Sequence, residues 1–443
     1  MPLHDSTLDA EGQTLQQASK NIAVGLRGSY RVTAAITALC CVLMALELWW
    51  MMSASRLAVF GAMGANSGIA VKEGEIWRLF ASVFLHGDII HLIVNMLAFW
   101  SFGILLESLL GPRRYLLLFG LSALGGSLAS AFLGSGAWSV GASGAIWGLM
   151  TAGIGIAYWP RDLLPRAMVA QLRQRVWIPL LLNAGYSVMP GVDVFAHLGG
   201  GVVGLALIAG LLTRNLKPVA DRAHPSDAER GPSPAITLAA VALGLVMALS
   251  SALALATGRP WALNAPLVFK RTAIGDTGFS AELPDAIAND PNVEQQAGMR
   301  MFAFGKFPGS TVVLEFLVLE LPREVLPGEV EMVLEQERQA LEQATPPGFT
   351  RVAPAQRVTV GGRPAVQVDY KLNELSLRTY VVVFSRHEVL MRRYALGELP
   401  EAWVGAEDKI VASLGHPSES HAPLALQPTV IGDPGISPPA PQQ

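Results

Sequence analysis

Three apolar stretches of the chain carry polar side chains of the types that perform acyl transfer. Ser143 opens one stretch, His197 opens another, and His91 and Asn95 lie together near the start of a third. A serine hydroxyl becomes a nucleophile only when a positioned base removes its proton, and histidine is the commonest such base. Donors nearby then stabilise the negative charge that develops on a carbonyl oxygen. These residues therefore predict a nucleophile, its base and the donors of an oxyanion site.

Glycine spacing predicts how the serine and the histidine meet. Gly144 and Gly148 lie four residues apart in one stretch, and Gly200 and Gly204 lie four apart in another. Residues four apart share a helix face, and glycines there let two helix backbones approach closely. Contact between the two glycine faces would bring Ser143 beside the histidine that precedes Gly200. Taken alone, the small residues around Ser143 are more typical of plain helix packing.

The same helical spacing groups the donors. His91 and Asn95 are four residues apart and share one helix face, and the backbone N–H of Ser143 at a helix start is a third donor. Asp193, the nearest acid before His197, falls one turn nearer water. We therefore expect Asp193 to be solvated and the imidazole to have no orienting acid.

Hydropathy predicts that membrane helices position these groups. The 443-residue chain is 51% hydrophobic and 15% charged, with a mean hydropathy of +0.40. About twenty apolar residues in a helix span a hydrocarbon core of about 30 Å. The predicted spans are residues 33–52, 86–110, 115–133, 143–158, 177–188, 194–212 and 235–256. Cys40 and Cys41 are adjacent and point apart on a helix, which excludes a disulfide framework.

Charge distribution predicts the orientation of the chain in the membrane. Lys and Arg precede the first span and occupy the connections between spans two and three, four and five, and six and seven. Positive charge favours the cytoplasmic side, so we expect a cytoplasmic amino terminus and an external carboxyl-terminal half. The polar, acidic residues 1–17 are unlike a signal peptide. A net charge of −3 without a basic stripe predicts no nucleic-acid partner.

The chain divides into a membrane part and a soluble part. Alternating polarity predicts strands in the soluble part, and apolar residues three and four apart predict helices. The strands include residues 311–320, 365–370 and 379–384, and the helices are 328–344 and 401–414. We therefore expect an all-α polytopic membrane bundle with a soluble α+β carboxyl-terminal domain. The predicted parts are a polar cytoplasmic tail (1–30), a six-helix core (31–213), a basic cytoplasmic linker (214–234), a seventh transmembrane helix (235–257), an extracytoplasmic α+β domain (260–418) and a disordered Pro-rich tail (419–443).

Residues 77–204 resemble the rhomboid family of intramembrane serine proteases. The motifs that carry the resemblance are Trp77-Arg78, His86-x4-His91-x3-Asn95, Glu107, Gly111, Gly141-x-Ser143-Gly144 and Ala196-His197-x2-Gly200-x3-Gly204. The resemblance implies a six-helix core with Ser143 and His197 as a catalytic dyad. It also implies that His91, Asn95 and the Ser143 amide are the oxyanion donors. Transmembrane proteins are the substrates that it implies, cut within the membrane lipid and without a cofactor.

Other residues of the motifs are expected to support the site. They are His86, Trp147, Gly141, Gly144, Gly200, Gly204, Trp77, Arg78 and Glu107. Trp147 stands where some relatives carry Tyr and others Phe, so it keeps aromatic packing against His197 but lacks a phenolic hydroxyl for proton relay. For Arg78 and Glu107 we favour a role in tying loops to helices over a role in the chemistry.

Other functions fit parts of the pattern. A rhomboid-like pseudoprotease binds membrane clients without cutting them, and such relatives typically lack the serine, the histidine or both. A transporter would spread its polar groups through the bilayer, whereas these groups converge at the starts of three spans. A zinc protease needs H-E-x-x-H, and an α/β-hydrolase needs a glycine where Ala145 stands. We expect neither a metal nor a cofactor.

The soluble part shows no clustered catalytic motif. His387, Asp369 and Ser385 fall on adjoining predicted strands without a nucleophile turn. The pattern that begins near Gly278 resembles the Mog1/PsbP-like fold, and we interpret this domain as a binding or regulatory module whose ligand the sequence does not identify. We expect an integral protein of the bacterial inner membrane, with this domain periplasmic or extracellular.

Overall fold

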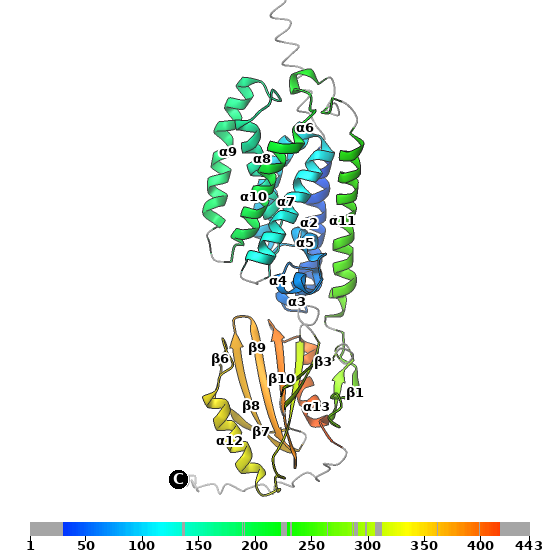
Figure 1. The fold of residues 1–443 in the computed structure, drawn as a ribbon, viewed down its shortest axis with the longest axis vertical. Helices are drawn as coiled ribbons and strands as arrows, with labels where there is room; N and C mark the ends of the chain where they lie inside the picture. Colours follow the sequence, from blue (N-terminus) through cyan, green and yellow to red (C-terminus); the bar gives the residue numbers. More distant parts are fainter. Residues whose placement is uncertain are drawn as a thin grey trace, which may run out of the picture. The chain divides into compact units, whose positions relative to one another are not determined.

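The computed structural model of the chain divides into two compact units (Figure 1). The first comprises Met1–Ala265, Lys306–Thr311 and Leu396–Glu401, and the second comprises Pro266–Gly305, Val312–Ala395 and Ala402–Gln443. The structure describes residues 30–134, 138–187, 189, 191–222, 228–230, 233–263, 265–285, 287, 291–296, 299–305, 312–360, 362–397 and 399–416. Outside the described residues lie nearly all of the predicted tail 1–30, the whole of the predicted tail 419–443, and parts of the predicted linker 214–234.

The first unit is a bundle of helices. They are α2 (Arg31–Met51), α3 (Arg56–Met63), α4 (Gly68–Lys72), α5 (Arg78–Ala81), η1 (Ser82–Phe84), α6 (Ile89–Leu110), α7 (Pro112–Leu133), α8 (Ser143–Tyr158), α9 (Arg166–Ser187), α10 (Val194–Leu207), η2 (Ile208–Leu212), η3 (Val219–Asp221), α11 (Pro234–Gly258) and η4 (Pro260–Ala262). Among the described residues, five helices are long and apolar enough to cross a membrane: α2, α6, α7, α10 continued by η2, and α11 continued by η4. Helix α8 is also apolar but has 16 residues.

Two predicted connections of the first unit are in fact helical. Helix α9 runs from Arg166 to Ser187, so the predicted charged connection forms its first half and the predicted span 177–188 begins only in its second half. Arg166 and Arg173 lower the hydropathy of α9. Helix α9 is therefore not one of the five described helices that are apolar enough to cross a membrane. The predicted connection 53–82 contains α3, α4, α5 and η1. Helices of three to eight residues are too short to produce a hydropathy signal.

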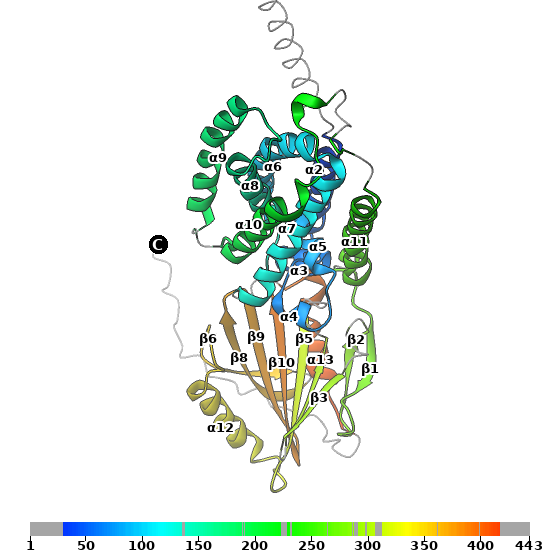
Figure 2. The same ribbon diagram turned by 45° about the horizontal axis from the view of Figure 1, so that its top comes forward.

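Helices α7, α8 and α10 lie side by side through contacts that only glycine permits (Figure 2). A Cβ atom on Gly200 would lie 1.9 Å from the carbonyl oxygen of Gly144, and one on Gly204 would lie 2.2 Å from that of Gly148. Both distances are far below van der Waals contact, so the two predicted glycine faces meet. On another side of α10, a Cβ atom on Gly199 would lie 2.5 Å from a backbone oxygen of α7.

The second unit is an α+β domain. Its elements are β1 (Phe269–Ala273), β2 (Ser280–Pro284), β3 (Pro291–Gln296), β4 (Met299–Phe304), β5 (Val312–Glu320), α12 (Val330–Gln343), β6 (Thr350–Arg351), β7 (Gln356–Val360), β8 (Arg363–Leu372), β9 (Leu375–Val383), β10 (His387–Leu396), η5 (Glu401–Trp403) and α13 (Ala406–Ser413). Strands β1 and β2 pair, and the other eight form one sheet in the order β3-β4-β5-β10-β9-β8-β6, with β7 paired to β8.

Helix α12 covers one face of the large sheet (Figure 1). Leu334 on α12 is fully buried and shares an apolar core with Val366, Val368 and Tyr370 of β8. The predicted strands lie in β5, β8 and β9, and the predicted helices correspond to α12 and to the region of α13. The predicted fold class, a helical membrane bundle with a soluble α+β domain, is confirmed.

Candidate active site

The starts of α8 and α10 bring a serine and a histidine into contact. Ser143 is the first residue of α8, and His197 lies in the first turn of α10. Nε2 of His197 is 2.9 Å from Oγ of Ser143, which is the distance of a hydrogen bond. His197 is only 5% exposed, so the protein surrounds the imidazole on nearly all sides. The arrangement is that of a hydroxyl nucleophile held against a general base.

Trp147, one turn after Ser143 on α8, fixes the plane of the imidazole. The ring centroids of Trp147 and His197 are 5.6 Å apart and their planes differ by 20°, so the rings stack. Stacking restricts the tilt of the imidazole but leaves open which of its nitrogens carries the proton. The predicted aromatic packing is present, and another contact must select the tautomer.

Asp193 does not provide that contact. Its Oδ1 accepts a hydrogen bond from the backbone N–H of Ala196 at 3.0 Å, and its Oδ2 accepts one from the hydroxyl of Ser130 at 2.5 Å. The expectation that Asp193 is simply solvated is therefore wrong. Asp193 is the amino-terminal cap of α10 and ties that helix to α7.

A second serine, Ser187, contacts the opposite side of the imidazole. Its Oγ lies 2.6 Å from Nδ1 of His197 and 2.7 Å from the carbonyl oxygen of Asn183, one turn earlier in α9. Sequence reasoning missed Ser187, because no helical or strand periodicity relates two residues on either side of a loop. The only signal in the sequence is a polar residue at the end of an apolar segment.

His91 and Asn95 on α6 face the backbone just before Ser143. A Cβ atom on Gly141 would lie 3.1 Å from Nε2 of His91 and 3.4 Å from Nδ2 of Asn95. Gly141 also has a φ of 125°, which L-residues with side chains rarely adopt, so the backbone favours glycine here and a Cβ atom would be crowded by His91 and Asn95. Nδ2 of Asn95 is buried and has no hydrogen-bond partner within the described ranges. The amide nitrogen of Asn95 is thus available to an acceptor that enters this space.

A backbone contact determines which nitrogen of His91 carries the proton. The N–H of Gly87 donates to Nδ1 of His91 at 3.3 Å, so the neutral ring carries its proton on Nε2, the nitrogen that faces Gly141. His86 packs its ring edge-on against that of His91, with centroids 5.3 Å apart, and its backbone N–H donates to the buried Glu47. The ring of His86 is therefore in contact with the ring of His91.

Comparison with known proteins shows what this part of the chain is similar to. Residues 73–214 match the family model of the rhomboid domain. The chain carries a rhomboid domain. It is 34% identical over 151 residues to Rhomboid protease GluP of Bacillus subtilis, a match that covers 34% of this chain and 29% of that protein. It is 36% identical over 157 residues to RHOMBOID-like protein 1 of Arabidopsis thaliana, covering 35% of this chain and 39% of that protein.

The matches are confined to part of each protein, since this chain spans less than two fifths of the length of these two relatives. Among solved structures, the chain is similar to cyanobacterial PsbP (CyanoP) from Synechocystis at 13% identity and a TM-score of 0.25, covering 33% of this chain and 92% of that one. A likeness of this size carries no argument about function. The rhomboid domain and the long apolar helices together make the protein an integral membrane protein.

Arg78 braces the loop near the start of the matched residues 73–214. Arg78 pairs with Glu75 at 2.5 Å and donates to the carbonyl oxygens of Gly61 and Ala65 at 2.9 and 3.0 Å. Trp77 precedes it, and its indole Nε1 is buried without a partner among the residues that the structure describes. These contacts join Arg78 to the connection between α2 and α6.

Glu107 caps α2, the first described helix of the bundle. Its carboxylate accepts hydrogen bonds from the backbone N–H groups of Val32 and Thr33 at 3.1 and 2.9 Å, and from the hydroxyl of Thr33 at 2.8 Å. A carboxylate at a helix amino terminus satisfies free N–H groups and interacts favourably with the helix dipole. Glu107 thus joins the end of α6 to the start of α2.

The second unit does not assemble the three residues considered from the sequence. Asp369 is held by Arg378, whose Nε and a terminal nitrogen donate to its two carboxylate oxygens at 2.7 and 3.0 Å. Within the described ranges, no group of three or more His, Cys, Asp or Glu side chains could hold a metal ion.

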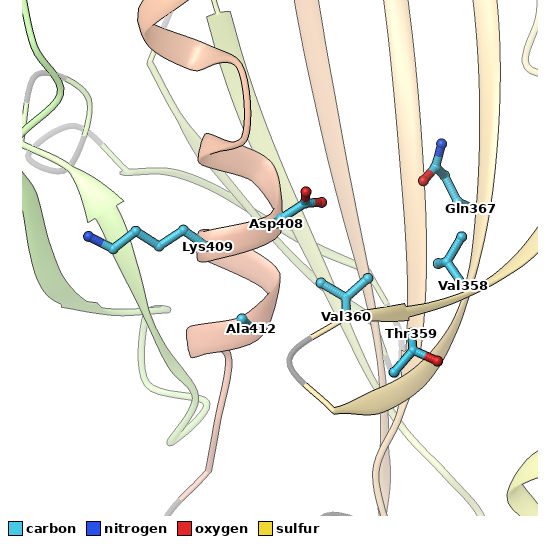
Figure 3. Close-up of a pocket in the computed structure, with 7 residues that line it drawn as sticks. All are labelled: Val358, Thr359, Val360, Gln367, Asp408, Lys409 and Ala412. Atoms are coloured by element: carbon cyan, nitrogen blue, oxygen red, sulfur yellow. The ribbon is translucent and has the colours of Figure 1, made fainter. Parts of the chain in front are cut away.

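A cavity of about 540 Å³ lies between α13 and the strands β7 and β8 (Figure 3). Its lining residues are Val358, Thr359, Val360, Gln367, Asp408, Lys409 and Ala412. The side chain of Lys409 extends away from the other labelled side chains, and its Nζ lies 3.4 Å from Glu282. The polar groups of the remaining lining are the carboxylate of Asp408, the amide of Gln367 and the hydroxyl of Thr359, which do not indicate a particular reaction.

Proposed function

We propose that the protein is an intramembrane serine endopeptidase that hydrolyses peptide bonds in or near the transmembrane segments of other membrane proteins. The observation that carries the proposal is the 2.9 Å contact between Ser143 Oγ and His197 Nε2 inside a rhomboid domain. A half-buried serine next to a buried histidine base, with the side chains of His91 and Asn95 facing the adjacent backbone, fits the needs of acyl transfer. Membrane lipid surrounds the bundle, and transmembrane proteins are the substrates.

In the acylation step, Ser143 Oγ attacks the carbonyl carbon of the scissile bond while His197 Nε2 takes its proton. The carbonyl oxygen becomes an oxyanion in the space beside Gly141, where Nε2–H of His91, Nδ2–H of Asn95 and the Ser143 amide can donate to it. His197 then gives the proton to the leaving amine, and the C–N bond breaks. Water hydrolyses the Ser143 ester by the same route, with His197 as base and then as acid.

The substrate must unwind before this chemistry, because a helical amide is hydrogen-bonded within its own helix. Residues that weaken helices near the scissile bond should therefore favour cleavage. The site residues lie near the starts of α6, α8 and α10, whereas Arg114, Arg161 and Arg214 follow the ends of these helices. By the positive-inside rule, we place the site at the outer side of a bacterial inner membrane, with the amino terminus in the cytoplasm. In that orientation the carboxyl-terminal domain is periplasmic or extracellular and serves binding or regulation.

The test is cleavage by purified full-length protein in lipid vesicles that contain a model transmembrane substrate. Ser143→Ala should abolish cleavage, because the change removes the nucleophile and little volume. Ser101→Ala is the matched control, since the Ser101 hydroxyl is exposed and bonds only the carbonyl of Leu97 in its own helix at 2.8 Å among the contacts described. Equal cleavage by the Ser143 variant would refute the proposal. Substrate binding without cleavage by the wild type would instead support a rhomboid-like pseudoprotease.

A further inference from the structure

Ser187 is the second hydroxyl at the dyad, and its position is built into the bundle. It ends α9, is 5% exposed, and touches His197 on the nitrogen opposite Ser143. The imidazole therefore lies between two serine hydroxyls, at 2.6 Å from Nδ1 to Ser187 and 2.9 Å from Nε2 to Ser143. The two contacts are not equivalent, because Ser187 has a second partner that decides the direction of its bond.

Proton counting gives that direction. A carbonyl oxygen can only accept, so the hydroxyl proton of Ser187 goes to the Asn183 carbonyl at 2.7 Å. The oxygen of Ser187 then has only lone pairs to offer to His197, and Nδ1 must carry the hydrogen of that contact. A neutral imidazole has one N–H. Nε2 is consequently left with a lone pair directed at the Ser143 hydroxyl, which is the tautomer that a general base needs.

We propose that Ser187 is a positioning residue that selects the base tautomer of His197, in the place where serine triads use a carboxylate. The proposal rests on the proposed function, since it concerns the base of that reaction. Trp147 fixes the ring plane, and Ser187 fixes the proton. When His197 takes the proton of Ser143, the Nδ1–H bond to Ser187 becomes charge-assisted and strengthens. A neutral hydroxyl stabilises an imidazolium less than a carboxylate does. Ser187 therefore orients His197 but raises its basicity less than a carboxylate would.

The test uses the full-length protein, with the cleavage rate and the His197 tautomer as two separate readouts. Ser187→Ala should lower kcat about three- to tenfold with KM unchanged, which is the effect of losing one neutral hydrogen bond. Nitrogen-15 NMR of histidine-labelled protein, with the His197 signals assigned by their absence in His197→Ala, should show Nδ1–H in the wild type. The variant should show a shift toward Nε2–H. Ser187→Thr, which keeps the hydroxyl, should restore both readouts.

Ser108→Ala is the matched control. Ser108 is also buried, at 3% exposure, and bonds the carbonyl four residues earlier at 2.7 Å, as Ser187 does, but does so on α6. Loss of helix stability alone would lower the activity of both variants equally and leave the tautomer unchanged, which would overturn the proposal. Wild-type kcat and tautomer in Ser187→Ala would overturn it too. Cleavage that survives in Ser143→Ala would refute the proposed function instead, and the NMR comparison would still decide on Ser187.

Discussion

At the scale of residues, the chemistry depends on which nitrogen of each histidine carries a proton. Gly87 assigns Nε2–H to His91 and thereby makes that ring a donor toward Gly141. Ser187 assigns Nδ1–H to His197 and thereby makes that ring an acceptor toward Ser143. Two imidazoles on different sides of the same serine thus receive opposite roles from their hydrogen-bond partners.

The role of Asn95 can be measured directly. Asn95→Ala should lower kcat by about 10²–10³, equivalent to about 2.7–4 kcal/mol of barrier, because one oxyanion donor is lost. KM should change little, since the donor acts mainly on charge that develops in the transition state. Steady-state kinetics in vesicles provide the measurement, and thermal unfolding checks that the variant is folded. Wild-type kcat in the variant would mean that Asn95 serves packing alone.

The stability of the second unit should depend on pH because of a buried carboxyl group. Burial, with a smaller effect of nearby Glu337, raises the pKa of Glu388 on β10 from 4.5 to about 7. Between these values the folded domain holds a proton that the unfolded chain releases, so stability falls as pH rises, by about 3 kcal/mol at most. Glu388→Gln should raise the thermal midpoint of the domain at pH 8 and leave it nearly unchanged at pH 4. An equal gain from the exposed Glu374→Gln would contradict this origin.

Four residues of the candidate site can be predicted from the sequence, and Ser187 cannot. Ser143, His197, His91 and Asn95 are visible because polar groups are costly in apolar segments and helical spacing places them on defined faces. Ser187 is not visible, because its contact with His197 depends on how the chain returns between two helices.

At the scale of elements, the glycine contacts between α8 and α10 set the distance between nucleophile and base. Gly200→Ala would place a methyl group 1.9 Å from the carbonyl oxygen of Gly144 and must separate the helices. We expect loss of most activity and a lower thermal midpoint. Gly210→Ala is the matched control in the same helical stretch, because a Cβ atom there meets nothing within 4 Å. Equal activity of both variants would show that the close approach is not required.

The contact between α8 and α10 is predictable from the sequence because its glycines repeat every four residues. The boundaries of α9 are not predictable in this way. Hydropathy detects only the second half of α9, since arginines interrupt its first half although both halves form one helix. The short helices between α2 and α6 are likewise held by tertiary contacts such as those of Arg78, which no local pattern reports.

At the scale of the whole molecule, the proposed catalytic groups all lie in the first unit. The second unit should therefore be dispensable for peptide-bond chemistry and needed for selecting or regulating natural substrates. A truncation after about residue 215 would be a poor test, because Arg222 holds the carbonyl oxygens of Ser108 and Leu109, and Met247 of α11 packs against Gly120. Both features belong to the fold of the bundle.

A better design inserts a site-specific protease sequence between residues 263 and 269 and cuts the purified, folded protein. Cleavage of a generic transmembrane substrate should continue at a rate within about twofold of the uncut protein. The same insertion without protease treatment is the control. Loss of activity on cutting, with the first unit still folded by circular dichroism, would show that the second unit takes part in the reaction.

Turnover by the proposed protease should also be slow. Replacing the orienting acid of a serine triad lowers turnover by about 10⁴, and here a neutral hydroxyl stands in that place. The substrate must in addition enter from lipid and unwind. Steady-state turnover of a good transmembrane substrate should lie well below the enzyme median of about 10 s⁻¹, and a value at that median would contradict the expectation.

We expect His197 to activate Ser143 as a nucleophile, and covalent labelling measures that activation. The full-length protein is treated with a fluorophosphonate, which bonds an activated serine through phosphorus with loss of fluoride, and the adduct is located by mass spectrometry of peptides. We predict one adduct, on Ser143, that appears in the wild type and in Ser101→Ala and falls to background in His197→Ala. Labelling of Ser143 at the same rate without His197, or substrate cleavage by a protein that forms no adduct there, would contradict the dyad.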